Sequence, residues 1–107
     1  MTPFAIGVVT GLLALQAAIN APRSTFMDCL SRASQAAAGA NVPPNEYSDY
    51  VNLQCASAAN SYKSALVSFD VKNGIKKARA TADAETLVEE DIAMYASQYS
   101  AKVNRAK

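Results

Sequence analysis

Two cysteines, Cys29 and Cys55, are the residues of this chain whose type and spacing most readily support chemistry. They could form a disulfide, remain free thiols, act as a redox pair or bind a metal ion. A redox pair normally has the close spacing Cys-x-x-Cys, and a structural zinc site needs at least two further Cys or His ligands. The chain has no third cysteine and no histidine. We therefore predict a structural Cys29–Cys55 disulfide, with two buried free thiols in a reducing compartment as the alternative.

The absence of histidine also removes the commonest general base from the chain. Without histidine the chain cannot form a Cys-His or Ser-His-Asp nucleophile system, a zinc protease site or a Glu-x-x-His di-iron bundle. The phosphate-binding sequences G-x-x-x-x-G-K-[ST] and G-x-G-x-x-G are missing as well. We therefore expect a protein that is not an enzyme and that uses no cofactor and no metal ion.

Two clusters of charged residues follow each other in the C-terminal half of the chain. The first is a basic patch of four residues, Lys72, Lys76, Lys77 and Arg79. This patch could bind a phosphate, a lipid headgroup or an acidic partner, and it could also simply compensate a helix dipole and keep the protein soluble. No aromatic residues interleave with the patch to stack bases, and the net charge is only +1, so we expect no nucleic-acid partner.

The second cluster is an acidic run from Asp83 to Asp91. Glu85 and Glu89 share one helix face, but a single helix offers too few converging oxygens for calcium. We therefore interpret the run as a solvated helix face. The tyrosines leave two interpretations open, because Tyr62, Tyr95 and Tyr99 lie on predicted helix seams. Their rings could stack in the core, or they could line an inter-helix cavity for a small ligand.

Three predicted helices must position these residues, at about residues 25–40, 44–72 and 82–104. Apolar residues recur at helical spacing in each of them. Thr25-x-x-Asp28 has the spacing of a capping box at the start of the first helix. The turn between the first and second helices contains Gly39, Asn41 and Pro43-Pro44. Asn73-Gly74 marks the end of the second helix. The expected apolar stripes are Phe26, Leu30, Ala33 and Ala37, then Val51, Cys55, Ala58, Tyr62, Ala65 and Phe69, then Ala84, Val88, Ile92, Tyr95, Tyr99 and Val103.

The two cysteines lie at similar distances from the turn at residues 41–44 and would therefore meet in an antiparallel helical hairpin. Closing this loop of about 26 residues would stabilise the fold by about 3.5 kcal/mol in the chain-entropy description of disulfides. The sequence thus predicts the all-α class and a small antiparallel three-helix bundle with one disulfide.

An apolar stretch without charge, Phe4 to Ile19, precedes the bundle. At 1.5 Å per residue it reaches about 24 Å, which is short of the roughly 30 Å hydrocarbon layer and typical of a signal peptide. We therefore divide the chain into a leader, residues 1–21, and one helical domain, residues 22–107, with cleavage after Ala21 or, as the alternative, near Ala17 or Ala18. A retained membrane anchor and a buried cytoplasmic helix are the alternatives.

Together these features predict a small exported helical protein, periplasmic or extracellular, that acts through contacts with another protein or with itself. A membrane-anchored accessory protein that retains residues 1–21 is the first alternative, and it would place the chain at a membrane. A small-ligand carrier with a tyrosine-lined cavity is the second.

Overall fold

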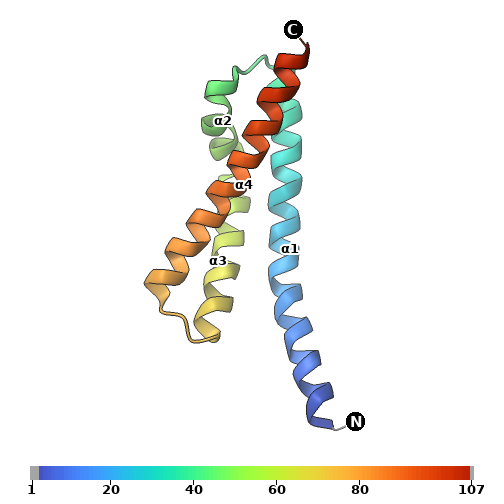
Figure 1. Ribbon diagram of the computed structural model, residues 1–107, viewed down its shortest axis with the longest axis vertical. Helices are drawn as coiled ribbons and strands as arrows, with labels where there is room; N and C mark the ends of the chain where they lie inside the picture. The colour runs from blue at the N-terminus through green and yellow to red at the C-terminus, as the bar shows by residue number, and fades with distance from the viewer. Residues whose placement is uncertain (1–2, 107) are drawn as a thin grey trace.

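The structure, a computed structural model, describes the backbone of residues 3–106 and the side chains of residues 18–106. Within this range all regular structure is helical: α1 (Pro3–Gly39), α2 (Tyr47–Gln54), α3 (Ala56–Lys72) and α4 (Lys77–Ala106), with a 3-10 turn at Pro44–Glu46 before α2. Figure 1 shows the chain rising along α1, descending through α2 and α3, and returning along α4 toward the turn between α1 and α2. The predicted all-α class is confirmed.

The core lies where α1, α2, α3 and α4 meet, and it consists largely of the residues that the helical spacing selects. All four stripe residues of the first predicted helix are buried, and Phe26 and Leu30 are fully inaccessible to solvent. Every residue of the other two predicted stripes is buried or half-buried. Two buried residues lie outside the predicted stripes, Tyr47 and Ala80.

The turn between α1 and α2 is held by its backbone and by two tyrosines. Asn41 adopts a left-handed conformation with φ 57°, and the N–H of Val42 donates to the Ala37 carbonyl, as expected for a helix that ends on Asn or Gly. The Tyr99 hydroxyl of α4 donates to the Val42 carbonyl, and the Tyr99 ring stacks on Tyr47 with 4.6 Å between centroids. The end of α4 is thereby tied to the α1–α2 turn.

The first predicted helix is longer than expected, because α1 runs without a break from Pro3 to Gly39 and passes through Pro22. Proline removes one helical hydrogen bond, but Ala17, Ala18 and Ala21 precede it, and alanine is the strongest helix former. The predicted capping box at Thr25 is wrong for the same reason. The Thr25 hydroxyl donates to the Ala21 carbonyl one turn back, at 3.1 Å, since the helix has already begun.

The second predicted helix is interrupted at Cys55, which separates α2 from α3 with φ −112° and ψ 17°. The helical hydrogen bonds from Cys55 to Val51 and from Ala59 to Cys55 remain, so the interruption is a local kink of one residue. The end of this helix agrees with the prediction, because α3 stops at Lys72 and Gly74 takes φ 89°.

The third predicted helix begins five residues earlier than expected, at Lys77 instead of about residue 82. Alanines at positions 78, 80 and 82 favour helix over this segment. The N–H of Ala80 donates to the Lys76 carbonyl at 2.9 Å, and Ala80 itself is buried. Part of the basic patch consequently lies in the first turn of α4 instead of in a separate loop.

Candidate functional site

The predicted disulfide is present and joins α1 to the junction of α2 and α3. Cys29 and Cys55 are bonded with their Cα atoms 5.8 Å apart. Cys55 is buried and Cys29 is half-buried, so one side of the bridge reaches the surface. The Gln54 carbonyl oxygen lies 3.8 Å from the Cys29 sulfur, at the place where the helix is kinked. The disulfide therefore holds the one irregular point of the α2–α3 segment against α1.

A shallow groove lies beside the disulfide on the surface between α1 and α3. Small side chains such as Ala36, Ser57 and Ser61 line much of it, and Asp28 and Arg32 add charges from α1. The groove is open to solvent and does not enclose a cavity. Its shape fits contact with another macromolecular surface better than it fits a small molecule.

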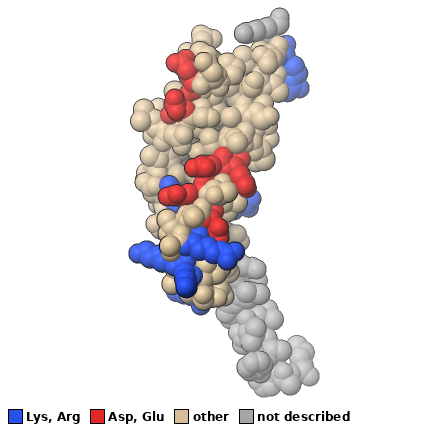
Figure 2. All heavy atoms as spheres, turned by 60° about the vertical axis from the view of Figure 1, so that its left-hand side comes forward, with Lys and Arg blue, Asp and Glu red and all other residues tan. Residues whose placement is uncertain are grey.

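The basic patch lies at the opposite end of the body from the α1–α2 turn, at the connection between α3 and α4. All four of its side chains, Lys72, Lys76, Lys77 and Arg79, are exposed. Figure 2 shows these cations gathered at the lower end of the described surface, with acidic side chains farther up α4. We call this surface the basic end. What the basic end binds stays a prediction at this point.

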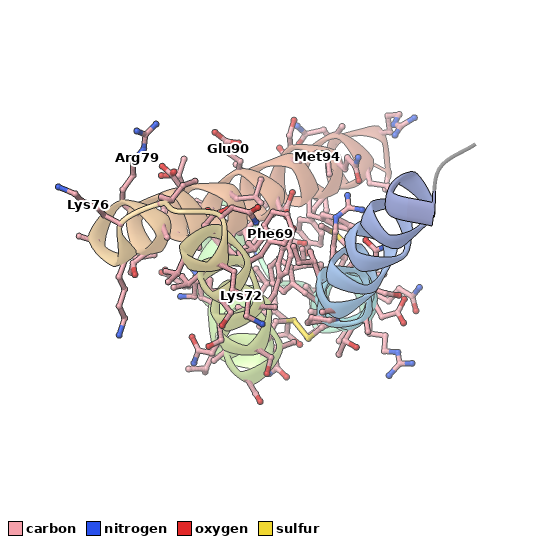
Figure 3. All side chains as sticks on the ribbon, turned by 90° about the horizontal axis from the view of Figure 1, so that it is seen from below. Phe69, Lys72, Lys76, Arg79, Glu90 and Met94 are labelled. Atoms are coloured by element: carbon pink, nitrogen blue, oxygen red, sulfur yellow. A yellow bond between two sulfur atoms is a disulfide. The ribbon has the colours of Figure 1, made fainter. Side chains whose placement is uncertain are left out.

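A small cleft opens next to the basic end, between the start of the described part of α1 and the end of α3. Ala18 and Ile19 form its α1 side, and Ala65, Phe69 and Lys72 are among the residues on its α3 side. Figure 3 shows Phe69 between α1, α3 and α4, with Lys72 beside it and with Lys76 and Arg79 pointing away from the body. The basic end thus borders an apolar cleft.

The acidic run agrees with the predicted solvated face at Asp83, Glu85, Glu89 and Glu90, which are all exposed. Asp91 differs, because it is half-buried and its Oδ2 atom has no hydrogen-bond partner among the described residues. Burial raises the pKa of the Asp91 carboxyl, the Arg23 guanidinium opposes this rise, and Glu90 adds to it. Burial also raises the pKa of the neighbouring Tyr62 hydroxyl, and the Asp91 charge adds to that rise.

Arg23 of α1, Tyr62 of α3 and Asp91 of α4 thus form a polar group. This group was not predicted from the sequence, although the sequence contains a signal for it. Asp91 directly precedes Ile92 and is spaced three and four residues from Val88 and Tyr95, so it lies at the margin of the α4 stripe. Arg23 is the first charged residue after the apolar N-terminal stretch. A carboxylate at the edge of a buried stripe is expected to meet a cation on the facing helix.

We expect Asp91→Asn to raise the free energy of unfolding at neutral pH by less than about 1 kcal/mol, because the group is only half-buried. The raised pKa means that the folded chain holds the Asp91 proton more tightly than the unfolded chain does. The charged carboxylate therefore costs stability above the raised pKa, and the cost disappears as the pH falls below the ordinary carboxyl range. Urea denaturation at neutral and acidic pH measures this difference.

The gain from Asp91→Asn should accordingly shrink in acid. Glu89→Gln is the matched control, since Glu89 is exposed and is not among the groups that shift the Asp91 pKa, so it should show no comparable gain. If Asp91→Asn lowered stability at neutral pH, the attraction to Arg23 would outweigh the cost of burial, contrary to this expectation.

The three seam tyrosines are used for packing. Tyr62 lies against Phe26 with 5.8 Å between ring centroids, and Tyr99 is stacked on Tyr47. Tyr62 and Tyr99 are buried and Tyr95 is half-buried. Neither the groove nor the cleft described above is lined by any of the three. The structure therefore lends no support to a tyrosine-lined ligand cavity.

Among the described residues no three Cys, Asp or Glu side chains come together in a way that could hold a metal ion. A search of the same part of the chain finds no helix with the length and apolar character needed to cross a membrane. Comparison with models of known protein families, with curated proteins and with solved structures finds no match to this chain.

Proposed function

We propose that the protein is an exported, non-enzymatic helical protein, periplasmic or extracellular, that works through contacts of its helix surfaces with another protein or with a second copy. We infer a three-helix antiparallel bundle for its body, in which α2 and α3 together form the middle member between α1 and α4. The directions of the chain in Figure 1 and the packing of α3 against both α1 and α4 support this arrangement.

The Cys29–Cys55 disulfide is the observation on which this proposal depends. Disulfides persist in oxidising compartments and are rare where glutathione and thioredoxin keep thiols reduced. Small domains bury a smaller share of their surface than large ones, so packing leaves them a narrow margin of stability, and a covalent link is a common addition in exported proteins. A structural disulfide in a chain of 107 residues therefore favours export.

The surface of the bundle supports contact with a macromolecule. The groove beside the disulfide presents small side chains together with Asp28 and Arg32, a surface that another helix could approach closely. The absence of histidine and of catalytic motifs supports a non-enzymatic role.

A membrane-anchored accessory protein is the second candidate function. One observation favours it: α1 continues without interruption from Pro3 through Pro22 into the bundle. The backbone thus has no separation between the apolar N-terminal stretch and the first helix of the body. In this candidate residues 1–21 are retained.

Mass spectrometry of the protein isolated from fractions of its natural host tests both candidates. We expect an exported protein that gains the mass of two hydrogens on reduction and whose native mass includes a bound protein or a second copy. An N-terminus near residue 18 or 22 would favour the first candidate, and a chain retaining residues 1–21 would favour the second. Reduced thiols in a cytoplasmic fraction would contradict both.

A further inference from the structure

Three of the four cations of the basic end lie at a helix end where the helix dipole is unfavourable for positive charge. Because α4 begins at Lys77, Lys76, Lys77 and Arg79 lie at its N-terminus, the positive end of the helix dipole. No acidic residue lies in the first turn of α4 to offset them. Only Lys72, in the last turn of α3, lies at a favourable helix end. Compensation of helix dipoles, which the sequence allowed as an explanation, therefore does not account for the basic end.

The cations are also poorly neutralised by the protein itself. Arg79 is 3.8 Å from Asp83, but both side chains are largely exposed, and ion pairs of this kind contribute little. No other ion pair is found among the described residues, so the three lysines are free to meet an external anion. The basic end is thus a concentrated positive surface on a protein whose net charge is only +1.

The apolar part of α1 leaves the body at this same end. Ala18 and Ile19 share the cleft with Lys72, which places these α1 residues level with the end of α3. From Ala18 back to Pro3 the helix continues for 15 residues, or about 22 Å at 1.5 Å per residue. The first charged residue along α1 is Arg23. An uncharged helix segment therefore projects past the basic end.

We propose that the basic end docks on the surface of an anionic phospholipid membrane, with Lys72, Lys76, Lys77 and Arg79 at the level of the headgroup phosphates. The apolar start of α1 enters the acyl layer from the same end. This inference rests on the second candidate function, in which residues 1–21 are retained. An acidic protein would use the cations alone, whereas a membrane uses both the cations and the adjoining apolar helix.

The distribution of negative charge sets the orientation of the docked protein. Glu89 and Glu90 lie 12 and 13 residues after Lys77 along α4, about 18 to 20 Å away at helical rise. Figure 2 shows the acidic side chains above the basic end. If the molecule lay flat, these carboxylates would approach the anionic surface and be repelled. The protein should therefore stand end-on, with the α1–α2 turn farthest from the membrane.

Cosedimentation of the full-length chain with vesicles tests the proposal. The vesicles consist of phosphatidylcholine alone or of phosphatidylcholine mixed with phosphatidylglycerol. We expect stronger binding to the anionic vesicles, which weakens as salt is added. The variant Lys72→Gln, Lys76→Gln, Lys77→Gln should bind the anionic vesicles about 100-fold more weakly, at about fivefold for each cation removed.

The matched control is Lys63→Gln, Lys102→Gln, Arg105→Gln, which removes the same charge from solvent-accessible positions outside the basic end. It should retain most of the binding, and the circular dichroism of both variants should match that of the original chain. Equal binding to both vesicles, unchanged by the lysine substitutions, would overturn the inference and leave a purely apolar anchor. No binding to either vesicle would also overturn it. The retention of residues 1–21 is judged separately, by the mass measurement.

Discussion

The double substitution Cys29→Ala, Cys55→Ala should lower the free energy of unfolding by about 3 to 4 kcal/mol, because it releases a loop that restricts the unfolded chain. The two cysteines are 26 residues apart in sequence. For a domain of this size each kcal/mol changes the melting temperature by roughly 4 to 8 °C, so we expect a decrease of about 15 °C or more. Thermal and urea unfolding followed by far-UV circular dichroism measure both quantities.

The unsubstituted protein in reductant is the natural comparison for this variant. Its melting temperature should fall to nearly that of the double variant, because both lack the same covalent link. Alanine suits position 55, since Cys55 is buried and a serine hydroxyl there would need a hydrogen-bond partner. A decrease of only a few degrees would mean that helix packing alone holds α1 against α2 and α3.

The regular parts of the fold could be predicted because they depend on local rules. The apolar spacing of Phe26 and Leu30 marks a buried helix face whatever the partner helix is. Asn41 could be placed in the first turn because few residue types tolerate a left-handed backbone there. The disulfide followed from the same information, since the position of the turn determines which helix residues lie side by side.

The irregular parts depend on competition between local rules and tertiary contacts. Pro22 and Thr25 both indicate a helix start, yet α1 has already begun in the alanine-rich segment before Pro22 and continues through both residues. Cys55 fits the apolar stripe of one continuous helix, and no glycine or proline near it indicates a kink at this position. The extension of α4 to Lys77 could not be predicted, because the residues typical of a helix start, Thr81 and Asp83, lie farther along the chain.

The same contrast applies to the candidate surfaces. The residues of the basic end are adjacent in sequence, so the patch could be identified without a structure. The position of the patch beside the apolar start of α1 could not be predicted, because it depends on which residues of α1 and α3 lie level with each other. The structure places Lys72 of α3 level with Ala18 and Ile19 of α1. The Arg23, Tyr62 and Asp91 group was likewise hidden, since its members come from three helices and only their packing brings them together.

Phe26→Ala should be the most damaging single substitution considered for the core, with a loss of about 3 to 5 kcal/mol in the free energy of unfolding. Phe26 is completely buried in α1, and its ring packs on Tyr62 of α3. Truncation removes the buried ring and leaves a cavity between the two helices. A chain of this size has a total stability of about 5 to 15 kcal/mol, so the variant should lose a large share of that stability even with its disulfide intact.

Two further substitutions separate the effect of burial from that of losing apolar atoms. Phe26→Leu keeps much of the ring volume and should cost less than Phe26→Ala, about 1 to 2 kcal/mol. Leu53→Ala removes an apolar side chain that is 82% exposed, and it should change stability by no more than about 0.5 kcal/mol. Urea denaturation of the three variants measures their losses in the free energy of unfolding and so tests the expected order. If Phe26→Ala were as mild as Leu53→Ala, the contact of α1 with α3 would not stabilise the fold, and the disulfide alone would hold these helices together.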